Sequence, residues 1–164
     1  RQNGERVHFT SAMTMTGNNE DTIREDRASY LDLALFIQDH SGNFKEDLTE
    51  LWRRIVFSIA VSNTDDHLRN HGFVIHNGAW RLSPAFDINP SIDKEELALN
   101  IDENSGALEF DLALSVIEYF RLQRKEAESI LSNVREVVRN WEKTAKKIRI
   151  GSAEIEMMRS AFRY

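Results

Sequence analysis

The stretch from Lys125 to Ile148 carries the longest regular pattern of apolar residues in this 164-residue chain. Apolar side chains recur there every three or four residues, which is the spacing of one face of an α-helix. Such a helix is stable only when its apolar face is buried against other elements. The chain is therefore expected to fold around packed helices. The residues of the pattern are Ala127, Ile130, Leu131, Val134, Val137, Val138, Trp141, Ala145 and Ile148.

Composition and shorter patterns also favour a mainly α fold. The chain has only 7 Gly and 2 Pro, so residues that break helices are scarce. A second amphipathic helix is predicted from Asp47 to Ser62, where Asp47 and Glu50 have the spacing of a capping box. This helix is the expected partner for the apolar face of the Lys125–Ile148 helix. Further helices are predicted at Tyr30–Gln38, at Phe110–Phe120 and after Gly151, with Ser152 as the cap.

One segment has the pattern of a β-hairpin. Its strands would be Gly72–His76 and Ala79–Leu82, and the Asn77-Gly78 pair between them is typical of a two-residue type I′ turn. Residues 1–16 are expected to be irregular or weakly extended. The hairpin, at about residues 71–83, is therefore predicted to be the main β element of the fold.

The hairpin brings together positions that are distant in the sequence. A two-residue loop fixes the register, so that His76 pairs with Ala79. Continued beyond the strands, this register places Asn70 opposite Ala85, and Asp87 follows just after. An amide from before the hairpin and a carboxylate from after it are therefore expected at the same open end.

Composition and charge exclude several classes of function. The chain contains no Cys, which excludes disulfides and thiolate metal sites and favours a cytoplasmic protein. No apolar run reaches the roughly 20 residues that a membrane-spanning helix needs, so no membrane association is expected. The net charge of −6 gives the domain as a whole no electrostatic basis for binding nucleic acid directly. The segment from Arg124 to Arg149 is locally basic; a solvated helix face is the favoured interpretation, and a docking face for an acidic partner is the alternative.

Two carboxylates and an amide flank the predicted hairpin. Asp65 and Asn70 precede it with the spacing D-x-x-x-x-N, and Asp87 follows it. Protein kinases use the same residue types in the same order: a base Asp, a magnesium-binding Asn, a hairpin and a magnesium-binding Asp. Transfer of a phosphoryl group to a hydroxyl needs one carboxylate to accept the proton, whereas Mg²⁺ takes carboxylate, amide and phosphate oxygens. The order and spacing therefore predict a kinase-type site.

The residues around these positions form two longer motifs. The first is Asn63-Thr-Asp65-Asp66-His67-Leu-Arg69-Asn70, and the second is Trp80-Arg-Leu-Ser83-Pro84-Ala85-Phe86-Asp87-Ile-Asn-Pro90-Ser91. Together they resemble the carboxy-terminal domain of the HipA-type serine/threonine kinases, the toxins of toxin–antitoxin pairs. The resemblance implies that residues 1–164 are a single helical lobe, similar to a kinase C-lobe, with one small β-hairpin carrying the catalytic loop and the metal-binding Asp. Weaker likeness extends to Arg6–Ala12, Glu50–Phe57, Leu97–Asn100 and Phe110–Leu114.

The resemblance also implies a role for each matching residue. Asp65 would be the catalytic base, and Asn70 and Asp87 would hold Mg²⁺. Asp66 would support the loop, and Ser83-Pro84 would shape the turn into Asp87. The residues implied to bind the nucleotide are His67, Arg69, Asn70, Phe86 and Asp87, with His67 and Arg69 near its phosphates and Phe86 beside it.

A cosubstrate and partners follow from the same resemblance. The implied reaction transfers the γ-phosphate of ATP to a protein hydroxyl, and the implied partner is a HipB-like DNA-binding antitoxin. The lobe itself is not expected to contact nucleic acid. The chain contains neither a Gly-rich phosphate loop nor a lysine in a strand context that could pair with the α- and β-phosphates. An amino-terminal nucleotide-binding lobe is therefore expected upstream of Arg1.

Two other functions remain open from the residues alone. Asp65, Asp66, His67 and Asp87 could bind a transition metal in a hydrolase, with His71 available as a further ligand. A kinase-like lobe without activity could instead serve as an interaction module. The residues expected to have only structural or surface roles are Trp52, Arg53, Arg54, His71, His76, Trp80 and Trp141.

Overall fold

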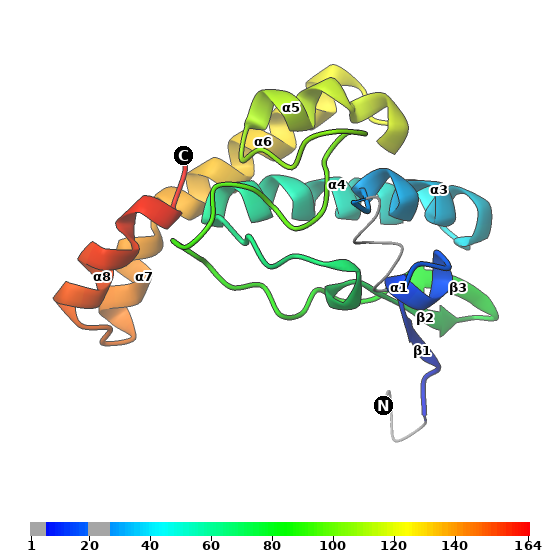
Figure 1. The fold of residues 1–164 in the computed structure, drawn as a ribbon, viewed down its shortest axis with the longest axis horizontal. Helices are drawn as coiled ribbons and strands as arrows, with labels where there is room; N and C mark the ends of the chain where they lie inside the picture. Colours follow the sequence, from blue (N-terminus) through cyan, green and yellow to red (C-terminus); the bar gives the residue numbers. More distant parts are fainter. Residues whose placement is uncertain (1–5, 20–26) are drawn as a thin grey trace.

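The structure is a computed structural model that describes residues 6–19 and 27–164. Helices make up most of it, and a small antiparallel sheet lies at one end of the helical body (Figure 1). The helices are α1 (Ala12–Met15), α3 (Tyr30–His40), α4 (Phe44–Val61), α5 (Phe110–Ser115), α6 (Arg124–Arg139), α7 (Trp141–Lys147) and α8 (Ser152–Met158). The 3₁₀ helices are η1 (Leu68–Asn70), η2 (Ile117–Phe120) and η3 (Arg159–Ala161). The strands are β1 (Phe9–Ser11), β2 (Gly72–His76) and β3 (Ala79–Leu82), in the sheet order β1-β2-β3.

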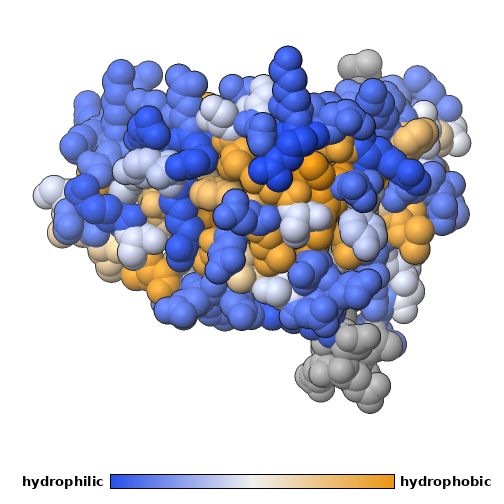
Figure 2. All heavy atoms as spheres, turned by 90° about the horizontal axis from the view of Figure 1, so that it is seen from above, coloured by the Kyte–Doolittle hydropathy of each residue, from blue (hydrophilic) through white to orange (hydrophobic). Residues whose placement is uncertain are grey.

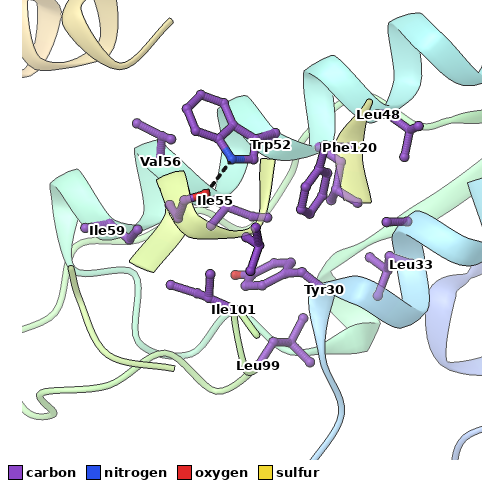
Figure 3. Close-up of a cluster of buried hydrophobic side chains, with 14 of the residues drawn as sticks. Tyr30, Leu33, Leu48, Trp52, Ile55, Val56, Ile59, Leu99, Ile101 and Phe120 are labelled. Atoms are coloured by element: carbon purple, nitrogen blue, oxygen red, sulfur yellow. Dashed lines mark hydrogen bonds between the residues drawn. The ribbon is translucent and has the colours of Figure 1, made fainter. Parts of the chain in front are cut away.

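Helix α4 lies at the centre of the hydrophobic core, in contact with α3, α5 and α6. Its apolar residues recur at helical spacing, and Trp52 and Ile55 on this face are fully buried. They face Tyr30 of α3 across the core (Figure 3). The indole nitrogen of Trp52 donates to the backbone oxygen of Ala113 in α5 at 3.0 Å, so this large side chain is buried without an unpaired polar atom.

The amino-terminal end of α4 differs from the prediction. The helix begins at Phe44 rather than at Asp47, and the predicted capping box does not form. The buried Asp47 carboxylate instead accepts a hydrogen bond from the backbone nitrogen of Leu82 at 3.0 Å and pairs with Arg81 at 2.9 Å. A partner far along the chain therefore replaces the local one, and Asp47 ties β3 to α4.

The predicted helix from Lys125 to Ile148 is two helices, α6 and α7, that meet at Asn140. The amide nitrogen of Asn140 donates to the backbone oxygen of Glu136 at 3.0 Å, and its backbone nitrogen bonds to Val137. An Asn that bonds to the preceding turn in this way competes with helical hydrogen bonding, which explains the break. Helix α6 still packs on α4 as predicted. Its buried residues are Ala127, Ile130, Val134 and Val138.

The ends of the apolar pattern are less buried than predicted. Val137 is 70% exposed and Ile148 is 66% exposed, so neither belongs to the core. Trp141 packs outside the main core, where its ring stacks on Phe162 with centroids 3.9 Å apart. Helix α8 begins at Ser152, and Gly151 occupies the cap position predicted for Ser152. Likewise, the predicted Phe110–Phe120 helix divides into α5 and η2.

The predicted hairpin forms with the predicted register. His76 pairs with Ala79, and Phe73 pairs with Leu82. The sheet also has a strand that was not predicted, because β1 pairs antiparallel with β2 and places Phe9 opposite Val74. With only three residues, β1 is too short for an alternating pattern to identify it.

Seen from the side of α5, the surface is mostly hydrophilic, and apolar residues show through in its middle (Figure 2). No helix within the described residues is long and apolar enough to cross a membrane. The end of the chain returns to α4, where the backbone nitrogen of Arg163 donates to the oxygen of Ala60 at 2.7 Å. The Arg163 side chain also donates to Ser62 Oγ at 3.1 Å, so the carboxyl end of α4 is covered.

Candidate active site

The first site segment begins where α4 ends. Ser62 adopts a left-handed conformation with φ of 51°, which turns the chain out of the helix. The backbone nitrogen of Asn63 then donates to the oxygen of Ser58 at 2.8 Å. The loop that follows carries Asp65 and ends in η1, whose last residue is Asn70.

A second segment, residues 83–91, runs antiparallel beside this loop. At one end, the backbone nitrogen of Ser83 donates to Gly72 at 2.8 Å. At the other end, Asn89 donates to the side chain of Asn63 at 3.3 Å, and Ser91 donates to Ser62 at 3.1 Å. Because hydrogen bonds join the segments on both sides of residue 87, this residue lies alongside the Asp65–Asn70 loop. The predicted register continues as far as Gly72 and Ser83, and the placement of Asn70 opposite Ala85 stays a prediction.

Asp65 is exposed, and its backbone holds the loop in shape. Its carbonyl oxygen accepts hydrogen bonds from the backbone nitrogen of His67 and from the side-chain amide of Asn70, both at 3.0 Å. Within the described residues, no hydrogen bond or ion pair engages the Asp65 carboxylate. An exposed carboxylate on a braced loop can accept a proton from an incoming hydroxyl group.

Asn70 and Asp87 have the chemistry of a magnesium site. The amide nitrogen of the buried Asn70 is committed to Asp65, which leaves its amide oxygen as the available ligand atom. Asp87 is exposed, and one of its carboxylate oxygens accepts from the side chain of Asn89 at 3.1 Å. One neutral and one anionic oxygen ligand suit Mg²⁺, which completes its shell with phosphate oxygens and water.

Asp87 also has an unusual backbone conformation. Its φ is 56°, in the left-handed region that residues other than Gly, Asn and Asp rarely adopt. Ser83 precedes this turn and is held from two sides, because its backbone oxygen accepts from Arg54 at 2.7 Å while its nitrogen bonds to Gly72. The prediction that Arg54 lies on the helix surface is wrong, since this side chain is buried between α4 and the end of β3.

The three remaining candidate residues lie around the same loops. His67 is half-buried, and its Nδ1 atom has no hydrogen-bond partner among the described residues. Arg69 is exposed on η1. Phe86 is 37% exposed and contacts Phe9 of β1 edge to face, with ring centroids 6.0 Å apart. This pair gives the site an apolar border on which a flat ring could pack.

Asp66 points inward, away from Asp65. It is 3% exposed, and its carboxylate accepts hydrogen bonds from the hydroxyls of Tyr30 and Ser58. His71 Nε2 lies 2.9 Å from the other carboxylate oxygen, within ion-pair distance although the ring N–H is not aimed straight at it. Sequence reasoning missed Tyr30, because nothing in the local pattern links it to a loop 36 positions away.

Burial and charge both act on the pKa values in this cluster. Burial alone would raise the pKa of Asp66, but the electrostatic interaction with His71 and the hydrogen bonds to the carboxylate outweigh it. The pKa of Asp66 therefore lies below its ordinary value. Burial and the nearby Asp66 raise the pKa of Tyr30 well above its ordinary value, so its hydroxyl stays protonated and donates.

The hydrolase alternative is not favoured. It required Asp65, Asp66, His67 and Asp87 to converge on one transition metal, but Asp66 is committed to the interior. Among residues 6–19 and 27–164, no group of three or more His, Asp or Glu side chains is placed to hold a metal ion. A site made of one amide and one carboxylate with phosphate oxygens is a different kind of site, and it suits Mg²⁺.

A family model described as the HipA-like C-terminal domain matches residues 1–141 of the chain. The chain belongs to this family. The match includes the loop, the hairpin and the segment with Asp87, whereas most of α7 and all of α8 lie beyond it.

One relative in sequence and one solved structure are similar to this HipA-like domain in different ways. A protein of Haemophilus influenzae (strain ATCC 51907 / DSM 11121 / KW20 / Rd), whose name describes it as a candidate kinase, is 36% identical over 64 residues, or 38% of this chain and 19% of that protein. A chain from the structure of the Shewanella oneidensis MR-1 toxin–antitoxin complex of HipA, HipB and its operator DNA has the same fold. It matches with a TM-score of 0.72 at 15% identity, over 98% of this chain and 43% of that chain. The HipA-like chain thus spans less than half of the length of either of these proteins.

Proposed function

We propose that this HipA-like domain is the catalytic lobe of a magnesium-dependent serine/threonine protein kinase. The observation that supports this most directly is the placement of Asp87 alongside the Asp65–Asn70 loop. An exposed carboxylate and two oxygen ligands for a cation therefore occupy neighbouring segments, as phosphoryl transfer requires.

In the proposed reaction, Asp65 accepts the proton of a serine or threonine hydroxyl on a protein substrate. The hydroxyl oxygen forms a bond to the γ-phosphorus of ATP, and the bond from that phosphorus to the β,γ-bridging oxygen breaks, releasing ADP. The proton remains on Asp65 until it is lost to solvent. Asp65 suits this role because its carboxylate is exposed and has no partner among the described residues.

Asn70 and Asp87 would hold Mg²⁺ through the amide oxygen and the carboxylate. Mg²⁺ held there would supply positive charge that offsets the negative charge developing on the phosphates of ATP during transfer. His67 and Arg69, which lie on the same loop, would approach the phosphates, and Phe86 would pack beside the nucleotide. Asp87, in its left-handed turn, would supply the ligand from the second segment, and Asn70 would supply the ligand from the loop.

The proposed partner is a HipB-like DNA-binding antitoxin, as in the complex of the Shewanella relative. The protein that carries this domain would then be the toxin of a toxin–antitoxin pair. Contact with DNA would be made by the antitoxin, since this lobe carries a net charge of −6.

The test is transfer of labelled γ-phosphate by the full-length protein that contains this chain, compared with its Asp65→Asn variant. Asparagine keeps the size of the side chain but cannot accept the substrate proton. Transfer is expected to fall about 10²–10⁴-fold, which is the usual contribution of a positioned general base, while nucleotide affinity is retained. Equal activity of the two proteins would refute the assignment of Asp65. Absence of transfer in the unchanged protein would instead favour an interaction module without catalytic activity.

A further inference from the structure

A buried polar cluster lies directly behind the proposed catalytic loop. Asp66, the neighbour of the proposed base, contacts Tyr30 from α3, Ser58 from α4 and His71, which lies between η1 and β2. Tyr30 is fully buried and His71 is 3% exposed. Their rings meet edge to face with centroids 5.7 Å apart. Three separate parts of the chain therefore converge on one loop residue.

This cluster attaches the loop to the core, whereas the loop's own contacts join it only to itself. Asp65 is attached to the loop through its backbone, and its carboxylate is exposed. The adjacent Asp66 is anchored in the core by hydrogen bonds from the hydroxyls of Tyr30 and Ser58 and by the close approach of the His71 ring. Removing the hydrogen-bond partners of a buried carboxylate costs more free energy than removing those of an exposed one. Loop conformations in which Asp66 leaves the cluster are therefore strongly unfavourable.

The cluster extends from the core to both ends of the loop. Ser58 accepts a weak hydrogen bond from the side chain of Asn63 at 3.4 Å, just before the loop. His71 follows the loop directly, and its backbone oxygen accepts from Ala12 at 2.8 Å. The loop is thus held at its start, in its middle through Asp66, and at its end.

We infer that Tyr30, Ser58 and His71 act as positioning residues that hold Asp66 and thereby fix Asp65 and Asn70 for phosphoryl transfer. The inference rests on the proposed function for the part that concerns catalysis. None of the three is among the residues proposed to contact the substrate, the nucleotide or the cation. They act through Asp66 on the residues that do.

The decisive variant is Tyr30→Phe in the full-length protein. It removes one hydroxyl and keeps the ring that fills the core. A misplacement of reacting groups by about 1 Å can cost about 10²-fold in rate, so kcat is expected to fall between about 10- and 100-fold. KM for ATP should be unchanged, because the proposed nucleotide contacts are intact. Tyr119→Phe is the matched control, since Tyr119 is 51% exposed and removal of its hydroxyl should change nothing.

A role confined to stability would give a different result. Tyr30→Phe would then lower the melting temperature but leave kcat unaltered at temperatures where the protein is folded, and the inference would be overturned. If, in the same assay, the unchanged protein is active and Asp65→Asn is inactive, the proposed function still holds. Asp66→Asn is expected to lower kcat further, but it can also unfold the protein, so the inference is judged on Tyr30→Phe.

Hydrogen exchange provides a second measurement that needs no activity. In Tyr30→Phe, the amides from Asp65 to Asn70 are expected to exchange faster, whereas exchange in α4 is expected to be unchanged. Unaltered exchange in this loop would overturn the positioning role even if the proposed reaction were wrong. Faster exchange throughout α4 would also overturn it, because the effect would then be a general loss of stability.

Discussion

At the scale of single residues, Asn70 and Asp87 contribute unequally to a cation site. Asp87→Asn in the full-length protein removes the anionic ligand and should weaken both magnesium-dependent ATP binding and transfer, with partial recovery in excess Mg²⁺. Asn70→Ala removes a neutral ligand and should be milder. The measurement is a Mg²⁺ titration of nucleotide binding and phosphotransfer, with exposed Asp111→Asn in α5 as the control. If Asp65→Asn abolished metal binding and Asp87→Asn left it unchanged, the roles assigned to Asp65 as base and Asp87 as ligand would be wrong.

The lowered pKa of Asp66 predicts a dependence of stability on pH. A carboxyl with a folded-state pKa below its unfolded value of about 3.9 stabilises the fold above that value and loses this contribution as the pH falls through the folded pKa. Asp66→Asn should therefore reduce the free energy of unfolding at pH 7 by about 1–3 kcal/mol. The difference from the unchanged chain should shrink below about pH 4. Urea unfolding of both proteins at several pH values measures this difference in the free energy of unfolding. Exposed Asp39→Asn should show no such trend.

At the scale of elements, α6 offers two adjacent valines with opposite environments. Val138 is 4% exposed and Val137 is 70% exposed. Val138→Asp would bury an unpaired charge and should cost at least about 3 kcal/mol, a large part of the roughly 5–15 kcal/mol that stabilises a domain. Val137→Asp makes the same chemical change in solvent and should shift stability by no more than about 0.5 kcal/mol. Circular dichroism with urea distinguishes them, and similar losses in both would contradict the packing of α6.

The elements that could be predicted from the sequence are those whose cause is local. The Asn77-Gly78 turn determines its own geometry, so the hairpin and its register followed from a few residues. The buried face of α4 followed from its spacing. The capping box failed because Asp47 has a partner in Arg81, 34 positions away, that no local pattern reveals. The same reason hid Tyr30, whose phenol reaches Asp66 through the core.

At the scale of the whole molecule, the residues proposed to hold a nucleotide all come from one short part of the chain, between His67 and Asp87. The sequence has no Gly-rich phosphate loop to add further contacts. The 164-residue chain by itself should therefore bind ATP with Mg²⁺ no more tightly than roughly millimolar, a free energy of only about 4 kcal/mol. Isothermal titration calorimetry tests this. Micromolar binding would mean that the nucleotide site is more complete within this chain than its residues suggest.

The left-handed turn at Asp87 has a consequence for how such a sequence can evolve. The backbone there accepts Asp, Asn and Gly, whereas the proposed chemistry accepts only a carboxylate. Glutamate preserves the charge but not the conformation, and asparagine preserves the conformation but not the charge. Asp is therefore the single amino acid permitted at position 87 as long as the reaction is under selection. Asp and Asn codons differ by one base, so one mutation could silence such an enzyme and leave a folded, inert descendant.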